Sequence, residues 1–531
     1  MRPSCICIIG LLATGLSARG QQVSPAVAAR LADGERVRQR LGLSPEFDGT
    51  NVANLKIAVL DYGFDGVGGP RRYLPENAVL VENYDADFVR KFDLGDPAYT
   101  KEFEAGNRHG RDMAQIVWAV TGGKAAGPKF YLLNASGPTM LRRAVCYAIV
   151  ERVDIILFSG VFEGGGSGDG QGPINRIVDE ALAAGILWIN AAGNHGQHVY
   201  EGPIRVLRDG YLRLRDKPDI AALRFLNRVD ENSCTITLTW NDYRDTEDAG
   251  TDKDLDLFVE DWTGRPVGSA TKRQVSGEAP TGEDETRNPR ERLVLASLPA
   301  CPDVPNDPNI AYRIRVKAKS GKFMPGDRLR VLVTASQETY MAAGGAGPRQ
   351  AFEFLDASDR GEIYPPADHP LVLTAGDATV VSSVGPTIDG RPKPDVLIED
   401  SRAFYSDGRV TAGSSNAAAY FAGIVAVLKA AEPNLRASHL LALAKQINAA
   451  RPAADDRPRQ PWPPSDAASP LTRGRPTSTQ PISSLIEQRL RTPPRPQPPA
   501  PSPIMARMER SARAWQTPSR ERLSQLIRDG R

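Results

Sequence analysis

The chain has 531 residues, a net charge of +2 and 41% hydrophobic residues; at roughly 150 residues per domain this length predicts three to four structural units. Its apolar content is typical of a globular protein, and the near-zero net charge gives no electrostatic argument for nucleic-acid binding. No apolar run of about 18 residues occurs, so nothing predicts a membrane-spanning helix.

A short apolar run at the N-terminus predicts a signal peptide in residues 1–20. Arg2 precedes the apolar residues 5–12, and small residues follow at 17–20. One positive charge, an apolar stretch and small residues at the cleavage site are typical of secretory signal peptides. An N-terminal strand is the alternative interpretation. We therefore expect a secreted or periplasmic protein with an N-terminal extension at 21–54.

Three cysteines remain beyond the predicted signal peptide, and an odd number leaves one thiol over. Cys146 falls in a helical pattern, which predicts a buried thiol. Cys234 and Cys301 both lie in a strand-rich region and could pair in an oxidising compartment.

Residues 55–198 alternate continuous apolar runs with amphipathic ones, which predicts a parallel sheet covered by helices on both faces. The expected strands are 56–60, 129–134, 154–158 and 186–189. The expected helices are 109–120, 140–153 and 173–184.

Between residues 199 and 367 the hydrophobic period changes to two, and clusters of turn-forming residues separate the runs. This pattern predicts an all-β sandwich, with strands at 235–240, 255–259, 292–298, 312–316 and 328–333. Residues 368–450 return to the first pattern, with a strand at 371–373 and helices at 415–432 and 438–448. We therefore predict an α/β fold, a parallel-sheet domain interrupted by a sandwich insertion.

The tail at 451–531 has a different composition from the rest of the chain. It holds 15 Arg, no Lys and 7 acidic residues, a net charge of +8. Residues 451–503 contain 15 Pro and too little apolar surface to offset the entropy of ordering, which predicts disorder. A basic amphipathic helix at 504–531, or contact with an anionic cell surface, is an alternative to a solvated tail.

Four polar residues stand at informative places in the α/β parts. Asp61 follows an apolar strand, at the edge where open α/β sheets bind ligands. His109 opens a helix, Asn194 ends a strand and turn, and Ser415 starts a small-residue helix whose free N–H groups favour negative charge. Each alone is commonly a turn, cap or structural residue. Their chain order, Asp then His then Ser, matches one of the convergent catalytic-triad orders.

These segments resemble the signature blocks of the subtilisin-like serine proteases, peptidase family S8. The resemblance covers about 55–198 and 369–448, and the matching segments are 57–61, 109–110, 190–194, 413–415, 382–387 with 390–395, and 433–435. It implies a subtilisin-like α/β domain and a serine endopeptidase.

By this resemblance, Ser415 is the nucleophile, His109 the general base and then acid, and Asp61 the orienting carboxylate. The Asn194 amide and the Ser415 N–H would form the oxyanion hole. General chemistry agrees, because a serine hydroxyl needs a base, the base needs a carboxylate to fix its tautomer, and an amide stabilises developing charge.

The resemblance also implies that Ser159 and Gly160 belong to an edge strand that binds extended peptide, with Gly193 beside the substrate. Main-chain pairing favours polypeptide substrates of loose sequence preference. The glycine-rich run at 164–170 lacks the Lys-Ser/Thr ending of a phosphate loop and is interpreted as a flexible loop flanking the substrate. We expect a monomer with no nucleic-acid partner.

Some residues depart from the family pattern. Arg111 replaces a small Thr, and Asn416, Ala419 and Tyr420 replace an apolar residue, Pro and His. Arg111 and Tyr420 could narrow or charge the cleft. About 35 residues separate the predicted signal from the first strand, too few for the inhibitory pro-domain of many secreted relatives.

No cofactor is expected to be required, and two candidate metal sites have simpler alternatives. Asp252, Asp254 and Asp256 offer oxygen ligands for a structural calcium ion, but a solvated turn entering a strand is favoured. His195 and His198 are spaced as zinc ligands, but no third ligand is evident.

Two other functions remain open. A catalytically silent binding protein could use the same fold, and the altered residues near Ser415 keep this alternative open. A secreted esterase would share the chemistry, but the chain order and the absence of a G-x-S-x-G elbow disfavour it.

Overall fold

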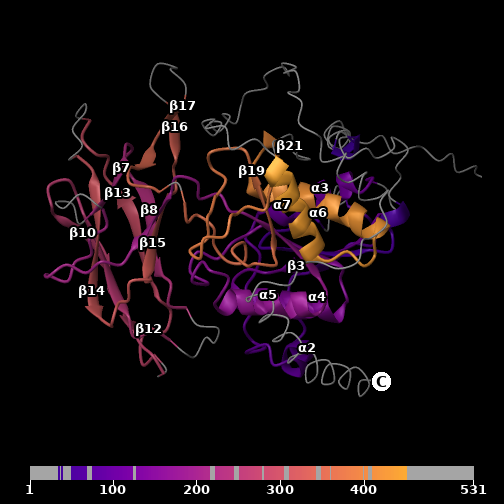
Figure 1. The fold of residues 1–531 in the computed structure, drawn as a ribbon, viewed down its shortest axis with the longest axis horizontal. Coiled ribbons are helices and arrows are strands. Elements are labelled where there is room, and N and C mark those ends of the chain that lie inside the picture. Colours follow the sequence, from indigo (N-terminus) through magenta and orange to yellow (C-terminus); the bar gives the residue numbers. More distant parts are fainter. Residues whose placement is uncertain are drawn as a thin grey trace, which may run out of the picture.

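The computed structural model describes residues 34–35, 37–39, 50–67, 74–123, 127–215, 222–243, 250–277, 280–303, 310–341, 348–358, 360–398, 400–404 and 410–450. The predicted signal peptide at 1–20 and tail at 451–531 lie outside the described residues. Figure 1 shows the two regions of the fold, with the strands of the insertion at the left and the helices that surround the main sheet at the right.

A seven-stranded sheet in the order β2-β3-β1-β4-β5-β19-β20 forms the centre of the α/β region, and its strand pairs are parallel. Its strands are β1 (Lys56–Asp61), β2 (Val79–Val81), β3 (Lys129–Asn134), β4 (Ile155–Phe158), β5 (Leu187–Ala191), β19 (Leu373–Asp377) and β20 (Val396–Ile398). The residues of β1 from Ile57 onward are buried, because helices cover both faces of a parallel sheet.

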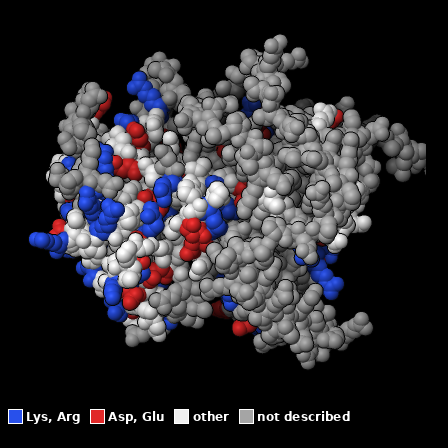
Figure 2. Space-filling view, in the orientation of Figure 1, with Lys and Arg blue, Asp and Glu red and all other residues white. Residues whose placement is uncertain are grey.

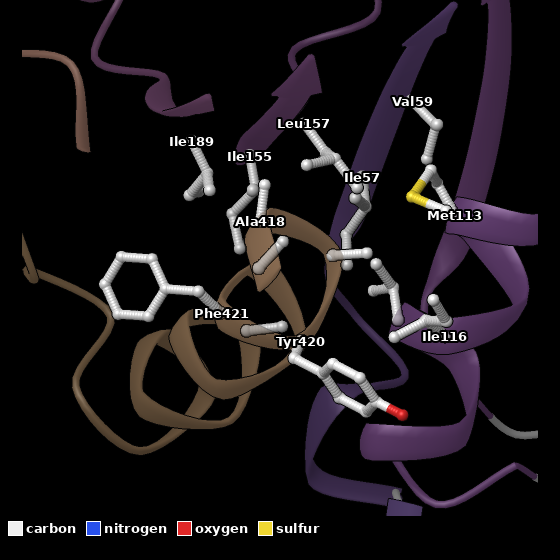
Figure 3. Packing of buried hydrophobic residues seen from close by; sticks show 14 of the residues in the cluster. Ile57, Val59, Met113, Ile116, Ile155, Leu157, Ile189, Ala418, Tyr420 and Phe421 are labelled. Carbon is white, nitrogen blue, oxygen red and sulfur yellow. The ribbon is translucent and has the colours of Figure 1, made fainter. Parts of the chain in front are cut away.

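Helices pack on both faces of this sheet. On one face, Ile57 and Val59 of β1 contact a cluster that includes Met113 and Ala418 (Figure 3). On the other face, Leu60 shares a cluster with Leu141 and Ile177 from two other helices. The helices are η1 (Thr50–Val52), α2 (Ala86–Lys91), α3 (His109–Val120), α4 (Pro138–Val150), α5 (Pro173–Ala183), α6 (Ser414–Ala431) and α7 (Ala437–Ala450).

Between β5 and β19 the chain forms a sandwich of a five-stranded and a four-stranded sheet, in the orders β10-β9-β14-β7-β18 and β13-β8-β15-β6. Apolar residues such as Leu257, Ile314, Ile236 and Val331 alternate along the strands and form one buried core, as period-two patterning predicts. The strands are β6 (Val199–Pro203), β7 (Leu223–Asn227), β8 (Asn232–Trp240), β9 (Asp254–Glu260), β10 (Pro266–Ala270), β13 (Arg290–Leu298), β14 (Tyr312–Ser320), β15 (Arg328–Ala335) and β18 (Phe352–Phe354).

Three further pairs of short strands complete the described structure. They are β11 (Arg273–Gln274) with β12 (Glu285–Thr286), β16 (Thr339–Met341) with β17 (Pro348–Gln350), and β21 (Ala403–Phe404) with β22 (Val410–Thr411). The fold class predicted from the sequence is confirmed. Several predicted bounds differ by a few residues: the strand expected at 371–373 begins only at Leu373, and the helix expected at 140–153 spans Pro138–Val150.

Cys234 and Cys301, whose pairing the sequence left open, are both free thiols. They share the hydrophobic core of the sandwich, where Cys234 is buried and Cys301 packs at its side. Burial raises the pKa of Cys234 to about 12, so its unreactive thiol behaves as a small apolar side chain. Cys146 is half-buried rather than fully buried.

The surface of the sandwich carries both signs of charge. On the face seen in Figure 2, Lys and Arg side chains are interspersed with Asp and Glu side chains over this region. Of the helices in the described part of the chain, none has the length and hydropathy that a bilayer crossing requires.

Candidate active site

The predicted catalytic and substrate-binding residues gather where the central strands of the parallel sheet end. Asp61 is the last residue of β1, Ser159 directly follows β4, and Gly193 and Asn194 follow β5. These strands are neighbours in the sheet, and β4 lies between β1 and β5. The carboxyl ends of parallel strands meet at one edge, which is why residues more than 130 positions apart come together.

Asp61 and His109 form a direct contact. The Nδ1 atom of His109 lies 2.7 Å from Oδ2 of Asp61, and the backbone N–H of Tyr62 donates to Oδ1 of Asp61 at 2.8 Å. An ionised carboxylate only accepts hydrogen bonds. Nδ1 must therefore carry the proton, which leaves Nε2 of the neutral imidazole as an acceptor.

Gly110 allows this contact because α3 approaches β1 closely at its first turn. A Cβ atom at Gly110 would lie 2.5 Å from Cβ of Asp61 and 2.5 Å from the ring of Phe64. The ring of Tyr62 covers the other side, stacked on the imidazole of His109 with centroids 5.7 Å apart. The imidazole is thus held between the strand end and an aromatic ring.

The surroundings of His109 favour its protonated form. Burial lowers the pKa of His109, but the charge and hydrogen bond of Asp61 outweigh it, with help from the charges of Asp112 and Glu104. The pKa of His109 therefore lies above its ordinary value. A stronger base takes a serine proton more readily, but it is neutral over a narrower pH range.

Ser415 lies in the first turn of α6 and is half-buried. Its hydroxyl donates to the carbonyl oxygen of Ser159 at 3.3 Å, a long distance for an O–H donor. Within the described residues, no hydrogen bond joins Ser415 to His109. The structure therefore brings Asp61 together with His109, and Ser415 together with Ser159, but it does not join the two pairs.

The side chain of Asn194 is oriented by Ser414. Both the N–H and the hydroxyl of Ser414 donate to Oδ1 of Asn194, at 3.1 and 2.9 Å. Since both partners are donors, the amide must face them with its oxygen, which directs its NH₂ group away from them. The Ser414 hydroxyl also accepts from the N–H of Gly193 at 3.1 Å.

Sequence reasoning missed the orienting role of Ser414. Its only sequence signal is its place beside Ser415 in Gly413-Ser414-Ser415. Two adjacent hydroxyls at a helix start leave open which one turns inward. In the structure Ser414 is buried, while Ser415 is partly exposed.

A second histidine, His195, lies directly after Asn194, and its Nε2 is 3.8 Å from a carboxylate oxygen of Glu163. Burial, with the nearby charges of His198 and Arg330, lowers the pKa of His195 to about 4, so His195 is neutral at physiological pH. Burial also raises the pKa of Glu163. The sequence assigned no role to Glu163.

Arg111 and Tyr420 do not line a cleft, contrary to the expectation from sequence. Arg111 is buried, and its guanidinium contacts the carboxylate of Asp112. Tyr420 belongs to the hydrophobic core beside the sheet (Figure 3), and its hydroxyl donates to the carbonyl of Arg402. Both face inward because their helices turn these positions toward the protein interior.

No group of three or more His, Cys, Asp or Glu side chains that could hold a metal ion occurs in the described part of the chain. Asp254 and Asp256 lie buried on β9, whereas Asp252 is exposed. Lys319 contacts a carboxylate oxygen of Asp256 at 3.4 Å. Calcium binding by these aspartates stays a prediction.

Comparison with known proteins gives one informative match. A sequence model of the subtilase family matches residues 53–460. No curated protein matches the sequence significantly.

Several solved protease structures resemble the chain at low identity. The Clostridium perfringens CspB protease is 15% identical, with a TM-score of 0.47, over 80% of this chain and 93% of that chain. MycP1 with its propeptide removed is 14% identical, with a TM-score of 0.32, over 80% and 90%. A cold adapted subtilisin-like serine proteinase is 12% identical, with a TM-score of 0.31, over 77% and 84%. At these scores the likeness carries no argument about function.

Proposed function

The chain belongs to the subtilase family of serine-type peptidases, and from this premise we propose that it is a secreted endopeptidase with Ser415, His109 and Asp61 as its catalytic triad. The observation that carries the proposal is the contact of 2.7 Å between His109 Nδ1 and Asp61 Oδ2. It presents the Nε2 atom of a neutral imidazole as a base, which is what a serine nucleophile requires.

In the first step, Nε2 of His109 takes the hydroxyl proton of Ser415 while Oγ forms a bond to the scissile carbonyl carbon. The Ser415 hydroxyl must first leave the Ser159 carbonyl by rotation of its side chain. Catalytic hydrogen bonds are often absent or long in unliganded enzymes. The carbonyl electron pair moves to oxygen, and the oxyanion accepts hydrogen bonds from the Ser415 N–H and the NH₂ group of Asn194.

In the second step, the tetrahedral intermediate collapses, and His109 returns the proton to the leaving amine as the carbon–nitrogen bond breaks. Water then attacks the acyl carbon and gives a proton to His109. As the carbon–Oγ bond breaks, His109 passes this proton to Ser415 Oγ and the carboxylic acid product leaves. Asp61 stays ionised throughout and stabilises the imidazolium.

The substrate class that fits is extended polypeptide. The Ser159 carbonyl accepts from the Ser415 hydroxyl, and the Gly193 N–H donates to the adjacent Ser414. Main-chain hydrogen bonds from Ser159, Gly160 and Gly193 would hold an extended peptide of loose sequence preference. Residues 1–20 would direct export, and intact mass measurement of the exported protein tests their removal.

A fluorophosphonate probe tests the assignment, because it reacts only with an activated serine. Wild type is expected to be labelled and to cleave casein, Ser415→Ala to do neither, and Ser320→Ala, which changes a surface serine of the sandwich, to match wild type. Labelling that persists in Ser415→Ala would overturn the nucleophile assignment.

A catalytically silent binding protein is the second candidate. The observation that favours it is the Ser415 hydroxyl, which bonds to the Ser159 carbonyl and not to His109. Wild type that is folded by circular dichroism but neither labelled nor able to cleave casein would support this candidate and exclude the peptidase.

A further inference from the structure

The chain after the proposed substrate-binding residues Ser159 and Gly160 soon enters a glycine-rich loop. Residues 164–172 read Gly-Gly-Gly-Ser-Gly-Asp-Gly-Gln-Gly and contain no helix or strand. Glycine loses more conformational freedom on folding than any other residue, so a glycine-rich segment needs external contacts to hold one shape. Contrary to the expectation of a flexible loop, its residues 165–168 are buried.

The inserted sandwich supplies several of these contacts through Tyr243, just after β8. The Tyr243 hydroxyl donates to the Gly164 carbonyl at 2.5 Å, and its backbone N–H donates to the Ser167 hydroxyl at 3.0 Å. Ser167 in turn donates to the Tyr243 carbonyl at 3.4 Å. Tyr243 is 7% exposed, so water cannot readily replace these bonds.

Arg330 of β15, the strand next to β8, makes a second set of contacts. Its guanidinium donates to the Gly166 carbonyl at 3.4 Å and to the Ile363 carbonyl at 2.7 Å. It also stacks on the ring of Tyr364 at 4.2 Å, near the end of the insertion. Arg330 is 2% exposed, so its guanidinium bonds to the protein and not to water at the contact between the sandwich and the loop.

The loop is therefore held between the insertion and the α/β region. From the α/β side, the Ile388 N–H donates to the Gly168 carbonyl at 2.9 Å, and the Gly170 N–H donates to Asp368 at 3.1 Å. Shortly before the loop, the Phe162 N–H donates to the Pro365 carbonyl at 2.7 Å. Loss of the sandwich contacts would leave residues 164–167 with only local bonds, such as those from the Ser167 N–H to the Gln171 carbonyl at 3.3 Å and from the Ile174 N–H to the Gly165 carbonyl at 3.4 Å.

Ser159 and Gly160 follow β4 and are not themselves in a strand, contrary to the edge strand expected from the sequence. We propose that the inserted sandwich positions this substrate-binding segment, and that Tyr243 and Arg330 are positioning residues that act through loop residues 164–168. This inference rests on the proposed peptidase function. It assigns the insertion a part in binding extended substrates, because a peptide that pairs along this segment needs the segment held in register. A small probe that meets only Ser415 does not need it.

The test compares Tyr243→Phe with Tyr312→Phe. Both remove one hydroxyl from a buried tyrosine of the sandwich, but Tyr312 donates to the Pro299 carbonyl within the sandwich itself. Tyr243→Phe is expected to raise KM for an extended peptide roughly 3- to 10-fold, the effect of one lost hydrogen bond. Its kcat and its rate of fluorophosphonate labelling should stay those of wild type, and Tyr312→Phe should leave KM unchanged.

Ser167→Ala offers a second variant, which removes the loop side of the same contacts and should also raise KM selectively. Hydrogen exchange gives a readout that needs no activity. The peptide covering 159–168 should exchange faster in Tyr243→Phe, and peptides from the sandwich core should not.

The outcomes separate the two proposals. An active wild type whose KM and exchange are unchanged in Tyr243→Phe overturns the positioning role and leaves the peptidase standing. An equal change in Tyr312→Phe overturns it too, since the effect is then one of general stability. A wild-type protein that is neither labelled by fluorophosphonate nor able to cleave casein overturns both the peptidase and the positioning role. This holds even if hydrogen exchange at 159–168 is altered in Tyr243→Phe.

Discussion

The parallel sheet and the inserted sandwich differ in how they hold buried carboxylates. At the end of β1, Asp61 is fully buried but accepts hydrogen bonds from a backbone N–H and from His109. In the sandwich, Asp254 and Glu291 are also buried, and Oδ1 of Asp254 makes no hydrogen bond to any described residue. Burial raises the pKa of Asp254 to about 6 and that of Glu291 to about 7.

This difference indicates which substitutions should change activity and which should change stability. A buried charge with well-placed partners orients a neighbouring group, whereas one with too few partners destabilises the fold in its ionised form. We therefore expect substitutions at the edge of the parallel sheet to change reaction rate with little effect on stability. Substitutions inside the sandwich should do the reverse.

Asp61→Asn is expected to have the largest effect. The amide can present a donor to Nδ1 of His109 and so favour the wrong tautomer, which should lower kcat/KM about 10⁴-fold. Casein cleavage measures the effect on activity, and thermal unfolding measures the effect on stability. A melting temperature that falls with activity would show that Asp61 serves mainly the fold.

Asn194→Ala should lower kcat by about 10²- to 10³-fold and change KM little, because its amide acts only on the oxyanion. The Asn194 side chain is exposed, but its Oδ1 accepts the hydrogen bonds of the Ser414 N–H and hydroxyl, so the free energy of unfolding should fall by about 1 kcal/mol. Steady-state kinetics on a peptide substrate measures the effect. A rise in KM at constant kcat would instead place Asn194 in substrate binding.

Ile314→Ala probes the sandwich core, where Ile314 is fully buried. Removing its side chain should lower the free energy of unfolding by about 2–5 kcal/mol, measured by urea denaturation. The kcat per labelled serine should stay constant. Val294→Ala, at an exposed position of the same sandwich, serves as the control and should change stability by less than about 0.5 kcal/mol.

The pH dependence of kcat/KM tests the state of His109. Because Asp61 and neighbouring carboxylates raise the pKa of His109 despite its burial, the acid limb of the profile should lie above pH 6.5, the ordinary pKa of histidine. Below that limb, activity should fall about tenfold per pH unit as the protonated imidazole ceases to accept the serine proton. An acid limb below 6.5 would contradict the assignment.

Glu291→Gln tests the carboxylates of the sandwich and should have the smallest effect. A carboxyl group whose pKa is higher in the folded than in the unfolded state binds more protons when folded, so its stabilising effect is present at low pH and is lost as pH rises toward about 7. The substitution should therefore raise the melting temperature at pH 8 relative to wild type and have less effect at pH 5. A larger effect at pH 5 would contradict the stated cause.

Much of this architecture could be predicted from local pattern. The helix at His109–Val120 and the strand at Lys129–Asn134 have the predicted bounds, because continuous apolar strands and amphipathic helices leave distinct periods. The approach of Asp61 to His109 followed from the strand-end rule together with the family resemblance. The sandwich was visible as alternating residues, of which Leu257 and Ile314 are core examples.

Contacts across the insertion could not be predicted. Nothing local connects Tyr243 with Gly164 or Arg330 with Gly166, because each pair is brought together by the docking of two regions that fold on different patterns. Arg111 shows the same limit on a smaller scale. The sequence suggested that Arg111 could narrow or charge the cleft, but the packing of α3 buries its side chain.

The sequence alone determined the succession of elements, the break in period that marks the insertion, and the residue types capable of hydrolytic chemistry, since these depend on local periodicity and chain order. Tertiary structure decided which of two adjacent serines turns inward to orient Asn194, which hydroxyl holds the glycine-rich loop, and that Ser415 bonds to Ser159. Hydrogen bonds are sensitive to fractions of an ångström, and over separations of 79 to 256 residues only the packed molecule sets such distances.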